Sequence, residues 1–136
     1  MTEELGRLRE EFASLPDGFS RYSYLLELSS LLDTGHPALR REENLYRGCQ
    51  SAVWLYPVVE NGAVKLYADS DSLLLRGVLY LYSAVLDGTD PSGPDPAGED
   101  LVEALGLSEF FDSARTAGVR GLRGEIRRRL AAGTTA

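Results

Sequence analysis

One stretch of the sequence, residues 52–69, constrains the fold most strongly because its pattern is that of a β-hairpin. Residues 52–60 and 64–69 are rich in β-branched, aromatic and aliphatic side chains, which favour strands. Between them stands Asn61-Gly62, a pair that tolerates the positive φ angles of a tight two-residue turn. Because an isolated two-stranded hairpin is only marginally stable in water, we expect other elements to cover it.

The two faces of the first predicted strand can be assigned from the alternation of its side chains. One face is expected to carry Val53, Leu55 and Val59. The opposite face is expected to carry Trp54, Tyr56 and Val58. Pro57 cannot donate a ladder hydrogen bond, so it indicates an edge strand or a bulge. Residues 44–47 are a candidate for a third strand.

Helical patterns flank the hairpin on both sides. Residues 72–86 are apolar nearly all round, which is typical of a buried helix. Ser20 is expected to cap the second helix, and Gly35 to end it. Arg127-Arg128-Arg129 is expected to interact with the negative end of the last helix dipole. The predicted helices are 2–15, Ser20–Asp33, 72–86, 99–104, 108–112 and 113–130.

Length and charge restrict the class of protein. The 136 residues, of which 43% are apolar, suit one domain over 1–136 with one core. A net charge of −7 repels phosphate backbones and anionic lipids, so nucleic acid and membranes are not expected partners. No apolar run approaches the roughly 20 residues of a membrane span, and the acidic first residues are unlike a secretory signal. We therefore expect a cytoplasmic protein.

Cys49 is the only cysteine and the strongest candidate for chemistry. One cysteine excludes an internal disulfide, a redox pair and a four-thiolate metal site, which fits a reducing compartment. A lone cysteine is commonly a small buried apolar residue. Here, however, Gly48 allows a tight turn, and Gln50 and Ser51 supply hydrogen-bond donors. Arg47 is near enough in sequence to favour the thiolate, which is the nucleophilic form.

Other polar residues carry weaker signals. His36 is the only histidine and precedes a proline, which indicates a loop residue. One histidine and one cysteine do not make a zinc-type ligand set, so no metal site is expected. A Cys49–His36 nucleophile pair would require the fold to bring the two together. Asp69 and Asp71 are expected to cap the following helix or to lie in a solvated turn.

Motifs in a fixed order along the chain match one known family. They are Asn44 with Gly48-Cys49-Gln50-Ser51 and Val53-Trp54; the helix Phe19–Leu28 with its Arg-Tyr-x-x-Leu-x-Glu-Leu pattern; Ala68-Asp69-Ser70-Asp71-Ser72 with Arg76-Gly77; and Leu105-Gly106-Leu107 with Arg115, Gly118 and Leu122. Together they resemble the SufE/CsdE family of sulfur-acceptor proteins. The chain departs from that pattern at Ala52, where Gln is usual, at Tyr46-Arg47, where Val-Pro is common, and at Ser72, where Ala is usual.

The resemblance implies an α+β fold in which helices cover a small antiparallel sheet, similar to SufE and to IscU-type iron–sulfur scaffolds. It implies that Cys49 takes persulfide sulfur from a cysteine desulfurase of the SufS or CsdA type, stimulates that enzyme and relays the sulfur to a cluster-assembly scaffold. The chain would be an accessory protein without a cofactor, because the pyridoxal phosphate belongs to the desulfurase. Gly48, Gln50, Ser51 and Asp71 would support the loop around Cys49. Arg115 would act in docking or transfer.

Two other functions would use this sequence differently. A regulatory module could bind a desulfurase without accepting sulfur, and it would work without the thiol of Cys49. A thiol-based redox protein would instead let Cys49 react with peroxide to form a sulfenic acid.

Overall fold

The predicted hairpin forms the sheet of this protein. The computed structural model describes residues 3–98, 100–111 and 113–132, with only the backbone over 113–117. Strand β1 (Val53–Glu60) pairs antiparallel with β2 (Ala63–Ser70), with Val53 opposite Ser70 and Glu60 opposite Ala63. Asn61 and Gly62 have φ angles of 53° and 79°, so the predicted turn is confirmed and for the predicted reason.

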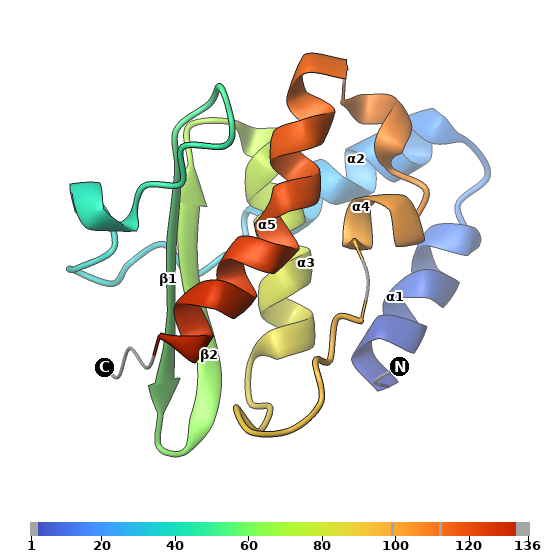
Figure 1. Ribbon diagram of the computed structural model, residues 1–136. Coiled ribbons are helices and arrows are strands. Elements are labelled where there is room, and N and C mark those ends of the chain that lie inside the picture. The colour runs from blue at the N-terminus through green and yellow to red at the C-terminus, as the bar shows by residue number, and fades with distance from the viewer. Residues whose placement is uncertain (1–2, 99, 112, 133–136) are drawn as a thin grey trace.

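Helices pack against the hairpin and against one another. Helix α3 packs on β2, α5 packs on β1, and α2 packs on α3. Figure 1 shows the hairpin along one side of the molecule, with α1 and α4 away from it. This arrangement confirms the α+β fold class. The helices are α1 (Glu3–Ala13), α2 (Gly18–Ser29), α3 (Leu73–Leu86), α4 (Leu101–Ala104) and α5 (Ser113–Ala131), with short 3-10 turns η1 (Glu42–Asn44) and η2 (Ser108–Phe110).

Helix α3 is the centre of the core, as its apolar sequence predicts. Its buried apolar side chains are Leu75, Val78, Leu79, Leu81, Tyr82, Val85 and Leu86. The Tyr82 hydroxyl accepts a hydrogen bond from the Leu101 backbone NH (3.2 Å), which joins α4 to α3. Gly77 lies against α2: a Cβ atom there would be 2.5 Å from the carbonyl oxygen of Leu25. A glycine is therefore needed where the two helices cross.

Val58 is fully buried, as are Val53 and Leu55 on the opposite face of β1. The reason is that both faces of the sheet are covered. On the face away from the main core, the chain before β1 places His36 against the rings of Tyr56 and Tyr67, with centroids 5.0 and 4.6 Å apart. Leu39 from this segment is also fully buried. The two-faced burial follows from this long-range covering, not from strand alternation.

The candidate third strand at residues 44–47 is not a strand. It makes one isolated bridge, Leu45 opposite Trp54, and the Tyr46 backbone NH donates to the Val53 carbonyl (2.7 Å). Within the described ranges the sheet has two strands. Packing of α3 and α5 against the hairpin supplies the stability that a third strand would otherwise have provided.

Two predicted helix ends also differ from the structure. Asp17, not Ser20, caps α2, because its carboxylate accepts the backbone NH of Ser20 (2.8 Å). The helix ends at Ser29, with Ser30 as its C-cap, so Gly35 is not its C-cap. No helix in the described part of the chain is long and apolar enough to cross a membrane.

Candidate functional site

Cys49 lies in the connection between η1 and β1, residues 45–52, which we name the Cys49 loop. The side chain is half-buried and packs against the edge of the main core. Its surroundings on α5 include Gly118: a Cβ atom added there would lie 2.9 Å from the Cys49 sulfur and would overlap the Gly48 carbonyl oxygen. The loop therefore lies directly on the backbone of α5, and the thiol rests where that helix has no side chain.

Tyr46 joins the same loop to the same helix. Its hydroxyl donates a hydrogen bond to the Gly118 carbonyl oxygen (2.9 Å). A Cβ atom at either Gly48 or Gly121 would overlap this hydroxyl. Tyr46 was not among the site residues predicted from the sequence. A usable signal was present in Gly118 and Gly121, since glycine is unfavourable inside a helix unless another group approaches closely.

The resting environment does not activate the thiol. Burial raises the pKa of Cys49 above its ordinary value, because a thiolate loses solvation there. The prediction that Arg47 would favour the thiolate is wrong for this conformation. Arg47 is exposed and its guanidinium pairs with Glu42 (3.1 Å), another exposed side chain. The thiol is thus held in its neutral, less reactive form.

This burial predicts a displaced pH profile for alkylation of Cys49. Because only the thiolate reacts, the raised pKa lowers the reactive fraction at neutral pH. The rate of iodoacetamide labelling should therefore rise at higher pH than it does for the same protein unfolded in denaturant. The measurement is the labelling rate against pH by intact mass spectrometry. Coincident profiles for folded and unfolded protein would contradict the burial of the thiol.

Asp71 connects the end of the Cys49 loop to the end of β2. Its carboxylate accepts the backbone NH of Ala52 (3.2 Å), and its own NH donates to the Ala52 carbonyl (3.3 Å). The capping role predicted for Asp71 is wrong, because the Ser72 hydroxyl caps α3 by accepting the NH of Leu75 (3.3 Å). Asp71 is one residue too early to cap, and so its carboxylate faces the loop instead. The loop-supporting role implied by the resemblance stays a prediction.

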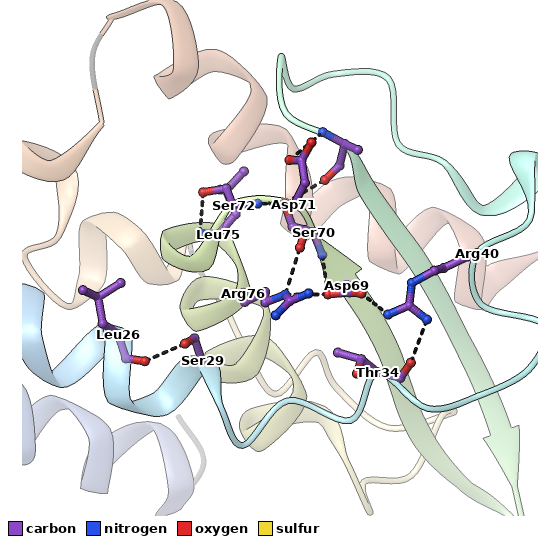
Figure 2. Close-up of polar contacts among 11 residues, drawn as sticks. Leu26, Ser29, Thr34, Arg40, Asp69, Ser70, Asp71, Ser72, Leu75 and Arg76 are labelled. Atoms are coloured by element: carbon purple, nitrogen blue, oxygen red, sulfur yellow. Dashed lines mark hydrogen bonds and ion pairs between the residues drawn. The ribbon is translucent and has the colours of Figure 1, made fainter.

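Asp69 forms a buried ionic centre beneath this contact. Its carboxylate, 2% exposed, pairs with both Arg40 and Arg76, as Figure 2 shows. The Arg76 Nε lies 2.7 Å from the carboxylate and also donates to the Ser70 carbonyl (2.8 Å). The prediction that Asp69 is a cap or a solvated turn residue is therefore wrong. Sequence proximity suggested a turn, whereas Arg40 reaches Asp69 from 29 residues away.

The neighbouring Ser70 links the buried ionic centre to the Cys49 loop. Its hydroxyl donates to the Ala52 carbonyl (2.7 Å) and accepts the backbone NH of Ser72 (3.1 Å). Ala52 is thus held by two consecutive residues of β2 and its extension, Ser70 and Asp71. The C-terminal end of the loop is fixed, three residues after the thiol.

Arg129 fixes the other end of the loop. Its guanidinium donates to the carbonyl oxygens of Asn44 (2.9 Å), Leu45 (3.2 Å) and Leu55 (2.8 Å). Glu125 orients it, with Oε2 2.8 Å from the Arg129 Nε. Hydrogen bonds from Arg128, and then from Arg129, lower the pKa of Glu125 to about 2. The prediction for the Arg127–Arg129 run is wrong for Arg129, because it binds carbonyls of the loop and β1 rather than those of its own helix end.

The remaining predicted site residues are Gly48, Gln50, Ser51 and Arg115. Gly48 and Gln50 are exposed and Ser51 is half-buried. Among the described residues, neither Gln50 nor Ser51 makes a side-chain hydrogen bond to Cys49. Arg115 lies in α5, but its side chain is outside the described residues.

Within the described ranges, the histidine and the acidic residues form no second site beside the thiol. His36 lies on the outer sheet face, where its Nδ1 accepts the backbone NH of Ala38 (3.0 Å). It is therefore not paired with Cys49. In the part of the chain that the structure describes, no three His, Cys, Asp or Glu side chains are grouped so as to hold a metal ion.

Comparison with known proteins adds independent evidence on the family and the fold of this chain. Residues 6–130 match the family model SufE, described as an Fe-S metabolism associated domain. The sulfur acceptor protein CsdE of Escherichia coli is 29% identical over 119 residues, 85% of this chain and 80% of that protein. The cysteine desulfuration protein SufE of Wigglesworthia glossinidia brevipalpis is 34% identical over 71 residues, 52% of this chain and 49% of that protein. A solution structure of a hypothetical protein from Thermus thermophilus shares the fold, with a TM-score of 0.75, 24% identity and coverage of 95% and 94% of the two chains.

Proposed function

The chain belongs to the SufE family, and from that premise we propose that Cys49 accepts sulfur from a cysteine desulfurase and relays it toward iron–sulfur cluster assembly. Relatives named as a sulfur acceptor protein and a cysteine desulfuration protein support this role. The observation that carries it is the position of Cys49, the only thiol in the sequence, on a loop at the edge of the core. The desulfurase is expected to be of the SufS or CsdA type.

The proposed chemistry is thiol–persulfide exchange. The Cys49 thiolate attacks the terminal sulfur of a persulfide held on the desulfurase cysteine. A new S–S bond forms on Cys49, the S–S bond of the donor breaks, and the donor cysteine leaves as a thiolate. One sulfur atom changes carriers, and no external oxidant or reductant is consumed.

The single cysteine suits a carrier of this kind. A persulfide on Cys49 meets no second thiol in its own chain, so no internal disulfide can form and expel the sulfur. The half-buried resting position limits access by oxidants, whose attack depends on exposure and thiolate character. Transfer then requires the loop to present the thiol when the partner docks.

The partner supplies the pyridoxal phosphate that removes sulfur from free cysteine, and we propose no cofactor for this chain. Sulfur leaving Cys49 would pass to a cluster-assembly scaffold. A cluster held on this chain is not proposed, because iron–sulfur clusters use several thiolate ligands and the sequence offers one.

Intact mass spectrometry tests the proposal directly. The protein is incubated with a SufS- or CsdA-type desulfurase, pyridoxal phosphate and cysteine, and its mass is measured with and without reductant. We expect a gain of one or more sulfur atoms that reductant removes. Protein alkylated at Cys49 beforehand is the control and should gain nothing. An unchanged mass with several active desulfurases would reject the relay, and a gain of oxygen after peroxide alone would support the redox function instead.

A further inference from the structure

Tyr46 contacts both β1 and α5, the two elements between which the Cys49 loop lies. Its backbone NH donates to the Val53 carbonyl of β1 (2.7 Å), so its main chain is fixed by the sheet. Its side chain crosses to α5 and donates to the Gly118 carbonyl (2.9 Å), 72 residues away in sequence. One residue therefore connects the start of the Cys49 loop to the helix on which the loop lies.

The Tyr46 hydroxyl is enclosed by backbone that only glycine allows to approach so closely. The backbone of Gly48 in the loop and that of Gly121 in α5 both approach it so closely that a Cβ atom at either would overlap it. The hydroxyl thus fills a space bounded by the loop and the helix. A side chain without the hydroxyl would leave that space empty and Gly118 without this donor.

The Cys49 thiol also packs against Gly118. The same residue whose carbonyl binds the Tyr46 hydroxyl would, with a Cβ atom, lie 2.9 Å from the Cys49 sulfur. Burial raises the pKa of Tyr46, so its hydroxyl remains a proton donor at neutral pH. Tyr46 and Cys49 therefore rest on one helical residue, and movement of one from α5 is coupled to movement of the other.

We propose that Tyr46 is the positioning residue that sets the resting place of Cys49. Its hydrogen bond to Gly118 holds residues 46–49 on α5, and rupture of that bond exposes the thiol. The role of this exposure in sulfur transfer rests on the proposed function, whereas the closed position of the loop does not. Asp71 and Ser70 hold the other end of the loop at Ala52, so opening is confined to the segment between.

The test is the alkylation rate of Cys49 in Tyr46→Phe, measured well below the melting temperature. One neutral hydrogen bond shifts an opening equilibrium by about three- to tenfold, and we expect the rate to rise by that factor. The alkylation pH profile should also shift toward lower pH, because the opened thiol regains solvation. Tyr24→Phe is the matched control. It removes another half-buried tyrosine hydroxyl, bonded to Glu11 at 2.5 Å in the α1–α2 contact, and should leave the rate unchanged.

Hydrogen exchange separates positioning from general stability. In Tyr46→Phe, exchange should rise over residues 46–51 while that of β2 and α3 stays at the wild-type level. A wild-type alkylation rate, or a rise matched by faster exchange throughout the core, would overturn the proposal. Gly121→Ala, which places a methyl group against the hydroxyl, should raise the rate as well and serves if Tyr46→Phe fails to fold. No desulfurase enters these measurements, so their outcome is independent of whether sulfur transfer is observed.

Discussion

Replacing Cys49 with serine is expected to abolish both the gain of sulfur and any stimulation of cysteine desulfurase turnover. Serine keeps the size of the side chain but cannot form a persulfide. The loss should be complete, because the sequence contains no second thiol to substitute. The measurements are intact mass after incubation and the rate of sulfide or alanine release by the desulfurase.

The same variant should remain folded, which makes it a clean test. Cys49 is half-buried on a loop at the edge of the core, so the free energy of unfolding should change by less than about 1 kcal/mol. Circular dichroism and denaturant unfolding provide the control. Full stimulation by folded Cys49→Ser would contradict the relay and support the regulatory binding module.

Replacing Asp69 with alanine is expected to lower the free energy of unfolding by about 3 kcal/mol. The change removes a carboxylate that is 2% exposed and binds Arg40, Arg76 and the NH of Ser70 (2.8 Å). Charge-assisted hydrogen bonds are each worth about 1.5–3 kcal/mol, and breaking a buried pair leaves its partners uncompensated. Both arginines are partly exposed and recover some hydration when the carboxylate is removed. The expected loss of unfolding free energy therefore stays at about 3 kcal/mol. Urea unfolding measures it.

Two further variants separate the cause of that loss. Asp69→Asn keeps the volume and removes the charge, so a similar loss would assign the effect to the ion pairs and not to a cavity. Glu42→Ala breaks an ion pair in which both side chains are mostly exposed, and it should cost less than about 1 kcal/mol. Equal losses for Asp69→Ala and Glu42→Ala would contradict a structural role for the buried centre.

Asp69 also has a consequence for the site. Its neighbour Ser70 binds Ala52, and Arg76 binds the Ser70 carbonyl. The ionic centre therefore supports the end of the Cys49 loop through two hydrogen bonds. If the proposed relay is right, the loop must open between this fixed end and the Tyr46 contact, and a partner that displaces Tyr46 from Gly118 would release the thiol without unfolding the hairpin.

The sequence alone determined those features that depend on residues close together in the chain. Asn61-Gly62 specified the hairpin because both positions need positive φ angles, which few residues adopt. The apolar run of 72–86 specified the buried helix α3. The isolated cysteine in its Gly-Cys-Gln-Ser setting identified the candidate site and, by resemblance, the family that the comparisons confirm.

Tertiary structure decided what surrounds the thiol. Tyr46 reaches Gly118 across 72 residues, Arg129 reaches Asn44 across 85, and Arg40 reaches Asp69 across 29. No local pattern encodes these pairs, because a side chain's propensity and period describe its own element and not the element packed against it. For the same reason Asp69 was assigned to a cap or a turn and Arg129 to its own helix end. Packing instead pairs Asp69 with Arg40 and Arg76 and directs Arg129 to the hairpin and its preceding loop. The identity of the candidate reactive residue, Cys49, was thus local information. Its burial, raised pKa and contact with α5 came from the packing of segments distant in the chain.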